Sequence, residues 1–301
     1  MASQRQRANQ GSRRQAQKQT QGGGSQPPRT RGGSYRRQRP WWSTPWAIGG
    51  ALAVVALVVV SFVIWSAASG SRAPGKPTEQ GTSQVIQQAT HVPASVYDAV
   101  PPGTTGLKAT NPPTVLRGQD GKPELLYVGA EYCPYCAAER WAMVLALSRF
   151  GTFSGLALTS SSGTDVYPNT PTFTFRNASY QSSFLTLTTV EIEDQQQHQL
   201  QQPTAREQQL MQTYDSGGSI PFLLVGGKYA ETGSGYQPDA LAGKSWQQIA
   251  ADLNNPSSPS TRAIVGEANM LTASICQMTG NQPGSVCQSQ AVQRAAARLP
   301  K

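Results

Sequence analysis

The sequence predicts an α/β domain preceded by a single transmembrane helix. Three observations support this fold class. Residues 47–68 form an uncharged, apolar stretch of the length that crosses a bilayer. Strand-like and helix-like segments follow one another through residues 92–290, as in an α/β domain. A Cys-x-x-Cys pair, Cys133 and Cys136, lies where a buried strand meets an apolar helix.

The first 46 residues form a basic tail. They hold ten of the 25 lysines and arginines and none of the 16 aspartates and glutamates, so the +9 net charge belongs to this tail. With almost no aliphatic residues, the tail cannot bury a core and is predicted to be disordered. A nucleic-acid-binding arm is one interpretation, but the adjacent apolar stretch favours a cytoplasmic flank that contacts anionic lipid. The rest of the chain holds the other 15 basic residues and all 16 acidic ones, a net charge of −1, which argues against a nucleic-acid-binding domain.

Residues 47–68 are predicted to form an uncleaved membrane anchor. Trp41, Trp42 and Trp46 precede the apolar run and Trp65 lies near its end, which matches the aromatic belts of a membrane span. The basic N-terminal flank predicts a cytoplasmic N-terminus and an extracytoplasmic C-terminal domain. The alternative is a cleavable signal peptide, but the run exceeds the ~7–15 residues of a signal core. All four cysteines follow the anchor, in a compartment where disulfides persist.

The segments that flank the domain are predicted from composition. Residues 69–91 contain prolines, glycines and polar residues and are expected to be a linker. Residues 92–123 are expected to be an irregular lead-in with one helical turn at residues 96–100. Residues 291–301 are expected to be a C-terminal tail.

The Cys133-Pro134-Tyr135-Cys136 motif follows a predicted strand at residues 125–130 and opens an apolar helix at residues 137–150. The amide N–H groups and dipole at a helix start stabilise a thiolate at Cys133. Pro134 fits the first helical position, where its missing N–H costs nothing. Cys136 lies on the same helical face. The motif therefore predicts disulfide exchange in which Cys133 is the reacting thiol and Cys136 resolves the mixed disulfide.

The middle of the chain is predicted to contain strands and a helix. Strands are expected at residues 153–160, 173–176 and 184–190, and the last two are expected to form a hairpin. A helix is expected at residues 204–214, because a capping box marks its start.

The last third of the domain is predicted to begin with a hairpin. Pro221 precedes a strand at residues 222–225, which turns at two glycines into a second strand at residues 228–232. Helices are predicted at residues 239–253 and 263–278.

The order of strand, CPYC helix, strand, helix, X-Pro, hairpin and helix resembles the thioredoxin fold, with an inserted hairpin and helix. In that superfamily a cis-proline loop lies beside the dithiol. The resemblance implies that Ile220-Pro221 is a cis peptide bond and that the Ile220 backbone pairs with substrate. Pro221 is expected to shape the substrate groove, and Pro134 and Tyr135, between the cysteines, are also expected to contact substrate. The Pro-Tyr pair is similar to that of glutaredoxins.

A closer likeness is to an uncharacterised family of membrane-anchored, thioredoxin-like prokaryotic proteins, known only as a domain of unknown function. It covers most of residues 92–290 and rests on YVGAEYCPYCAAERWAMVLALSRFG (127–151), SIPFLLVGGKY (219–229) and ANMLTASICQMTGNQPGSVC (268–287). This likeness implies fold and placement rather than a reaction. Tyr127 occupies the approximate place of the buried acid that thioredoxin keeps behind its dithiol.

The second cysteine pair, Cys276 and Cys287, is predicted to form a structural disulfide across a short turn. The alternative is a second dithiol that relays electrons to Cys136. No metal site is expected, because the four cysteines do not form two close pairs and His91 and His198 lie in polar surroundings.

The sequence therefore predicts a membrane-anchored thiol–disulfide oxidoreductase that acts on the thiols and disulfides of exported proteins. The dithiol is its own cofactor, and a redox protein in the membrane is a candidate partner. Glu139 and Arg140 on the dithiol helix are expected to be solvated or ion-paired rather than catalytic. The alternative function is a redox-inert, thioredoxin-like binding or scaffold domain at the cell envelope, with structural disulfides only.

Overall fold

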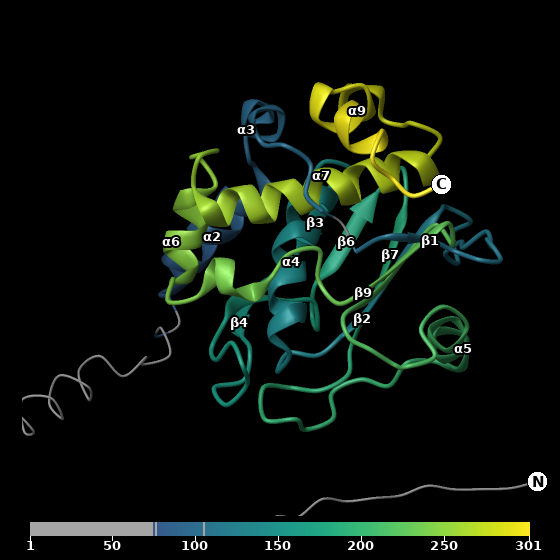
Figure 1. The fold of residues 1–301 in the computed structure, drawn as a ribbon. Coiled ribbons are helices and arrows are strands. Elements are labelled where there is room, and N and C mark those ends of the chain that lie inside the picture. The colour runs from purple at the N-terminus through teal and green to yellow at the C-terminus, as the bar shows by residue number, and fades with distance from the viewer. Residues whose placement is uncertain (1–74, 76, 105) are drawn as a thin grey trace, which may run out of the picture. The chain divides into compact units, whose positions relative to one another are not determined.

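The computed structural model describes residue 75, residues 77–104 and residues 106–301 (Figure 1). The predicted basic tail and membrane anchor lie outside these residues. Within the described part of the chain, no helix is long and apolar enough to cross a membrane.

A mixed five-stranded sheet, ordered β1-β9-β8-β2-β7, forms the centre of the domain and confirms the predicted α/β class. β2 (Glu124–Gly129) pairs in parallel with β7 (Thr186–Glu191) and antiparallel with β8 (Phe222–Val225). β8 and β9 (Tyr229–Thr232) form the predicted hairpin, and β1 (Lys108–Ala109) pairs with β9. The strand that leads to the dithiol therefore has neighbours on both sides.

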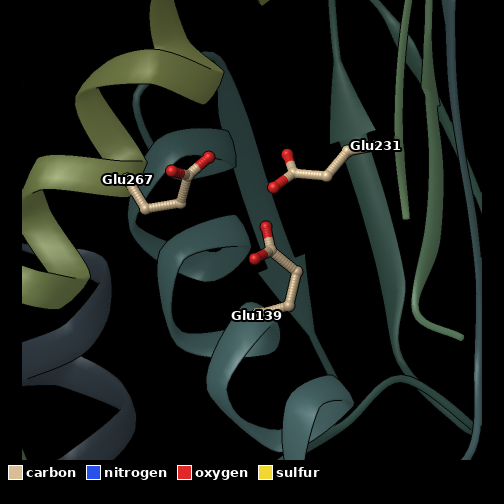
Figure 2. A group of neighbouring side chains, drawn as sticks. All are labelled: Glu139, Glu231 and Glu267. Atoms are coloured by element: carbon tan, nitrogen blue, oxygen red, sulfur yellow. The ribbon is translucent and has the colours of Figure 1, made fainter. Parts of the chain in front are cut away.

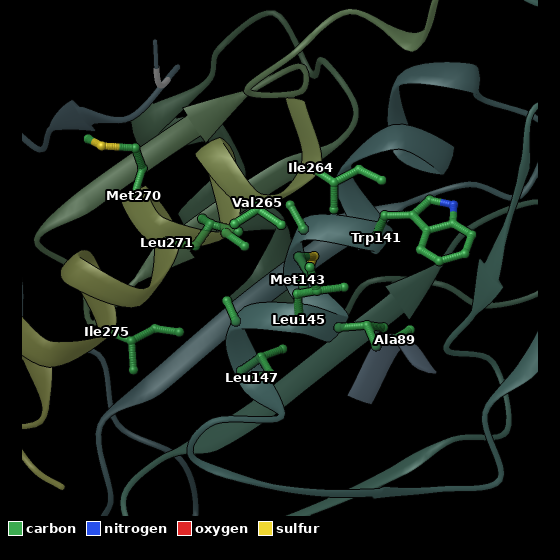
Figure 3. Packing of buried hydrophobic residues seen from close by; sticks show 14 of the residues in the cluster. Ala89, Trp141, Met143, Leu145, Leu147, Ile264, Val265, Met270, Leu271 and Ile275 are labelled. Carbon is green, nitrogen blue, oxygen red and sulfur yellow. The ribbon is translucent and has the colours of Figure 1, made fainter. Parts of the chain in front are cut away.

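Two long helices, α4 (Pro134–Leu147) and α7 (Pro259–Met278), pack against each other (Figure 1). Every residue of α4 except Tyr135 is buried, because this helix is apolar on almost all sides. Trp141 of α4 and Ile264 of α7 are among the side chains that fill the core between them (Figure 3). The dithiol thus begins a helix that the core holds along its whole length.

Successive side chains of β2 point to opposite faces of the sheet, so they belong to two different cores. Leu125 and Tyr127 belong to the large core with α4 and α7, whereas Leu126 and Val128 belong to a smaller core. α5 (Ala205–Tyr214) packs on this smaller core and begins with the predicted capping box. Helices therefore cover both faces of the sheet.

The strand predicted at residues 153–160 is in fact two strands, β3 (Gly151–Ser154) and β4 (Ala157–Ser160). Gly155 lies between them with a φ of +72°, a conformation that a glycine adopts readily. The turn at this glycine sends the two strands into different small sheets.

The hairpin predicted from residues 173–176 and 184–190 is wrong. β5 (Pro171–Thr174) pairs with β4, and β6 (Ser179–Ser182), which was not predicted, pairs with β3. β7 joins the central sheet beside β2 instead. Local strand patterns did not identify these partners, because the pairing is set by contacts with distant segments.

The predicted linker contains a helix, α2 (Glu79–Thr90), which corrects the boundary of the folded domain. Thr78 caps it by accepting a hydrogen bond from the Gly81 N–H at 3.2 Å. Val85 and Ala89, four residues apart on one helical face, are buried in the large core. This narrow apolar face is sufficient to hold an otherwise polar helix on the domain.

The predicted C-terminal tail also belongs to the fold. α9 (Gln290–Ala296) buries Ala291, Val292 and Ala295 in the large core. Small apolar residues at helical spacing dock this short helix against α7.

Two further helices were predicted, at residues 96–100 and at residues 239–253. The turn at residues 96–100 is the short helix α3 (Ala94–Ala99), as expected. The helix predicted at residues 239–253 is divided into the 3₁₀ helix η2 (Pro238–Leu241) and α6 (Trp246–Asp252), because Gly243 between them has a φ of +71°.

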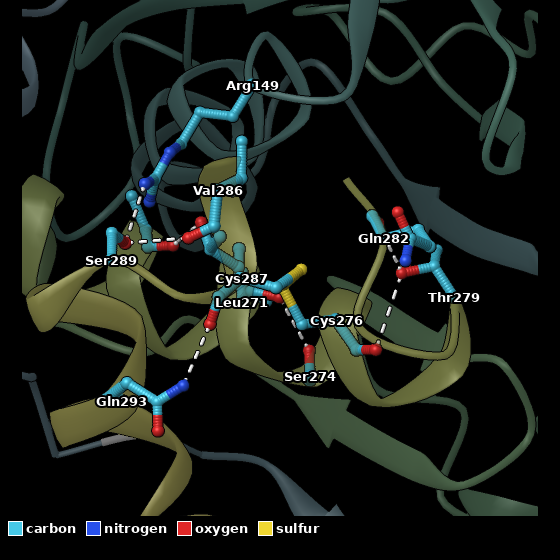
Figure 4. Close-up of a disulfide and its surroundings, with 12 residues drawn as sticks. Arg149, Leu271, Ser274, Cys276, Thr279, Gln282, Val286, Cys287, Ser289 and Gln293 are labelled. Carbon is cyan, nitrogen blue, oxygen red and sulfur yellow. Dashed lines mark hydrogen bonds between the residues drawn. A yellow bond between two sulfur atoms is a disulfide. The ribbon is translucent and has the colours of Figure 1, made fainter. Parts of the chain in front are cut away.

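The structure contains the predicted Cys276–Cys287 disulfide (Figure 4), with Cα atoms 5.6 Å apart. It joins α7 to the short helix α8 (Gly284–Cys287), and both cysteines are buried. A loop of this length contributes about 2–3 kcal/mol in the chain-entropy account. The bond fastens the C-terminal helices to the core.

Candidate functional site

Cys133 occupies the N-cap of α4, just after β2 ends. The Cys136 backbone N–H donates to Cys133 Sγ at 3.2 Å, and Pro134 is the first helical residue. Cys133 is 5% exposed, whereas Cys136 is fully buried. The geometry has the predicted asymmetry, with one thiol at the helix start and the other shielded behind it.

The two thiols differ in acidity. A hydrogen bond from the Cys136 thiol holds the pKa of Cys133 below its ordinary value, against the effect of burial, and the Cys136 N–H and the Arg140 charge add to this lowering. Burial raises the pKa of Cys136 well above its ordinary value, and its hydrogen bond to Cys133 raises it further. The arrangement favours a thiolate at Cys133 while Cys136 keeps its proton.

The Ile220–Pro221 peptide bond is cis, as the resemblance implied. The Cys133 thiol donates to the Ile220 carbonyl oxygen at 3.8 Å. Pro221 is buried and Ile220 is half-buried. The structure thus brings the loop before β8 next to the dithiol, although 87 positions separate the two residues in the chain.

Half-buried apolar side chains surround the dithiol and form what we call the dithiol collar. The collar consists of Tyr132, Tyr135, Ile192 and Ile220. The Tyr135 ring meets the Tyr167 ring edge to face, with centroids 6.1 Å apart. Pro134, which was predicted to contact substrate, is buried, so the half-buried Tyr135 is the more accessible member of the intervening pair. The collar provides partly accessible apolar surface around Cys133.

A buried ion pair lies next to the dithiol. Arg140 donates from Nε and Nη2 to the two carboxylate oxygens of Glu191 at 2.9 and 2.6 Å. Its Nη2 also donates to the Ala130 carbonyl at 2.7 Å. Both charged side chains are fully buried. The guanidinium charge lowers the pKa of both Cys133 and Cys136.

Tyr127 is also fully buried near this pair. Its ring lies edge-on to Phe175, with centroids 5.5 Å apart, and the Arg140 Cζ atom lies 5.8 Å from its centroid. Burial raises the pKa of the Tyr127 hydroxyl well above its ordinary value. Within the described residues this hydroxyl has no hydrogen-bond partner. A neutral phenol and an Arg–Glu pair therefore lie at the position for which the thioredoxin resemblance implies a buried acid.

Sequence reasoning missed Glu191, which lies at the end of β7 in a glutamine-rich, weakly patterned region. Arg140 was expected to be solvated or ion-paired, and it is ion-paired; its position four residues after Cys136 was the available signal. Glu139 is neither solvated nor in an ion pair within the described residues. It is fully buried and accepts a hydrogen bond from the Gly235 N–H at 3.1 Å.

Comparison with known families gives one match. Residues 117–277 match the family model described as a domain of unknown function, DUF929. No curated protein and no solved structure matches the chain. The matched region covers more than half of the 301 residues and includes β2, the dithiol helix, the Ile220–Pro221 loop and most of α7. The chain belongs to the DUF929 family.

Proposed function

We propose that the chain carries a thioredoxin-like domain that exchanges thiols and disulfides through Cys133 and Cys136. The observation that carries the proposal is the geometry at the start of α4, where Cys133 Sγ accepts a hydrogen bond from the Cys136 N–H at 3.2 Å and the Cys136 thiol is fully buried behind it. The lowered pKa of Cys133 and the raised pKa of Cys136 agree with this geometry. A thiolate is the attacking species in disulfide exchange, and a shielded second thiol can release the product. The sequence of elements around the dithiol and the cis Ile220–Pro221 bond support the fold assignment.

In the reductive direction, the Cys133 thiolate attacks one sulfur of a substrate disulfide. A Cys133–substrate disulfide forms, and the second substrate sulfur leaves as a thiolate. Cys136 then attacks Cys133 Sγ and passes its proton to a departing substrate thiolate. The substrate gains two electrons, its other thiolate takes a proton from water, and it is released as a dithiol, while Cys133–Cys136 becomes a disulfide. Oxidation of a substrate dithiol runs through the same steps in reverse.

The dithiol collar supports a polypeptide substrate. Its half-buried tyrosine and isoleucine side chains offer apolar contacts beside Cys133. The Ile220 carbonyl, within 3.8 Å of Cys133 Sγ, is an acceptor next to the reacting sulfur. We infer that the substrates are exported proteins, because the basic flank and apolar run at residues 1–68 favour a membrane-anchored, extracytoplasmic domain.

Replacing Cys136 by alanine is expected to trap mixed disulfides on Cys133. The variant can still attack a substrate disulfide, but no second thiol is present to release it. Cells that express the full-length Cys136→Ala chain should contain covalent complexes that disappear on reduction. Gel electrophoresis without reductant, followed by mass spectrometry of the complexes, identifies the substrates.

The matched control is Cys133→Ala, which leaves only the buried Cys136. It should form few or no complexes, since Cys136 is shielded and holds its proton. Equal trapping by the two variants would contradict the assigned roles. Absence of complexes with Cys136→Ala, in a folded chain, would favour a redox-inert binding domain.

A further inference from the structure

Three carboxylates meet in the interior of the domain (Figure 2). Glu139 comes from α4, Glu231 from β9 and Glu267 from α7, and all three side chains are buried. One carboxylate oxygen of each lies within 4.8 Å of those of the other two. Three separate elements therefore direct acidic groups toward one buried point, which we call the carboxylate triad.

Two oxygens of the carboxylate triad have no protein partner. Glu139 Oε2 accepts a hydrogen bond from the Gly235 N–H at 3.1 Å, and Glu231 Oε1 accepts one from the Gly106 N–H at 3.2 Å. Their other oxygens, Glu139 Oε1 and Glu231 Oε2, are buried and make no hydrogen bond within the described residues. A buried acceptor without a donor is unfavourable. Both oxygens therefore indicate a ligand between the carboxylates.

Glu139 and Glu231 also lack a counter-charge among the described residues. None of the ion pairs among the described residues includes Glu139 or Glu231. Like charges this close in a buried site repel one another, and a cation bound between them removes that repulsion.

We propose that the carboxylate triad binds a calcium ion. Ca²⁺ takes oxygen ligands at about 2.3–2.6 Å, so two oxygens on one ion can lie up to about 5 Å apart. All three oxygen pairs of the triad lie within this limit. Mg²⁺ keeps several waters and usually takes only one or two protein carboxylates. Three protein carboxylates directed at one point therefore favour Ca²⁺.

A pocket of about 400 Å³ lies next to the triad. Its lining includes Gly106, Gly235, Tyr236 and Arg262. The two glycines are the residues whose N–H groups hold Glu231 and Glu139. A Cβ atom at Gly235 would overlap the Glu267 carboxylate, so the absence of a side chain lets the loop cover the triad closely.

The test is a calcium titration of the full chain after treatment with EDTA. Calorimetry is expected to show one Ca²⁺ bound per chain, and the Tm is expected to rise with calcium concentration. The double variant Glu139→Gln/Glu231→Gln keeps side-chain volume but removes two charges, so it should lose calorimetric binding and the Tm rise. The control Glu79→Gln changes an exposed glutamate of α2 and should behave as the unaltered chain.

Other outcomes overturn the proposal. One is the absence of Ca²⁺ binding up to about 10 mM, a concentration beyond the ~1 mM dissociation constants of weak extracellular sites. The others are an equal Tm rise in the double variant and Mg²⁺ binding as strong as Ca²⁺ binding. If the double variant does not fold, terbium luminescence of the unaltered chain decides. Tb³⁺ at the triad should be sensitised through Tyr236, which lines the adjacent pocket next to Gly235. Ca²⁺ should quench that signal by displacement, and failure to do so would exclude a calcium site.

Discussion

Replacing Arg140 by methionine is expected to lower the free energy of unfolding by about 3–5 kcal/mol. Methionine fills much of the same space but leaves the Glu191 carboxylate buried without its two guanidinium hydrogen bonds. The Ala130 carbonyl also loses a donor. Urea unfolding of the full chain measures the change through the transition midpoint and its slope.

Two further variants separate the buried charge from general packing. The double variant Arg140→Met/Glu191→Leu removes both charges and should recover most of the loss, because no unpaired charge remains. Lys122→Met breaks an exposed pair with Asp120 and should cost no more than about 1 kcal/mol. If Arg140→Met lowers the free energy of unfolding no more than Lys122→Met does, the buried Arg140–Glu191 pair does not stabilise the fold next to the dithiol.

In the reduced protein, alkylation is expected to modify Cys133 well before Cys136. The alkylation rate of Cys133 should reach half its maximum at a pH below ~8.5, which is the pKa of a free cysteine. The reason is that the lowered pKa of Cys133 leaves a thiolate at lower pH. Cys136 should react only at high pH or after unfolding, since burial raises its pKa. Iodoacetamide labelling across pH, read by peptide mass spectrometry, gives both profiles.

The variant Cys136→Ala provides the matched control for this profile. The thiol of Cys136 is the largest contributor to the lowered pKa of Cys133, so its removal should move the alkylation midpoint upward. Preferential labelling of Cys136, or a Cys133 midpoint at or above that of a free cysteine, would contradict the assigned acidity.

The dithiol and its position could be predicted from the sequence because their signals are local. An apolar strand, Cys133, Pro134 and an apolar helix lie within one short stretch, and each residue has a defined place at a helix start. The hairpin after Pro221 was predictable for the same reason, since two glycines between apolar runs define the turn. The cis bond at Ile220–Pro221 followed from resemblance and not from these local patterns.

The buried charges could not be predicted because they depend on distant partners. Glu191 reaches Arg140 only when β7 pairs with β2, and the sequence indicated a hairpin for β7 instead. Glu139, Glu231 and Glu267 lie far apart in the chain and meet only after α4, β9 and α7 pack. Charged residues are ordinarily exposed, so nothing in the sequence near these residues indicates that they are buried.

The α2 helix was missed for a different reason. Its sequence is polar, and only a few apolar side chains, including Val85 and Ala89, hold it on the core. A polar segment flanked by prolines is typical of a linker, and a few apolar residues in its sequence are not enough to predict a helix that packs on the core.

The reduction potential of the Cys133–Cys136 pair tests the proposed exchange most directly. The full chain, with the Cys276–Cys287 bond intact, is equilibrated in glutathione buffers, and the alkylated peptide that contains both thiols is quantified. A thiol–disulfide exchanger should give a reversible two-electron couple between about −270 and −120 mV. A potential below about −300 mV, the range of structural disulfides, or no reversible couple at all would contradict the proposed function.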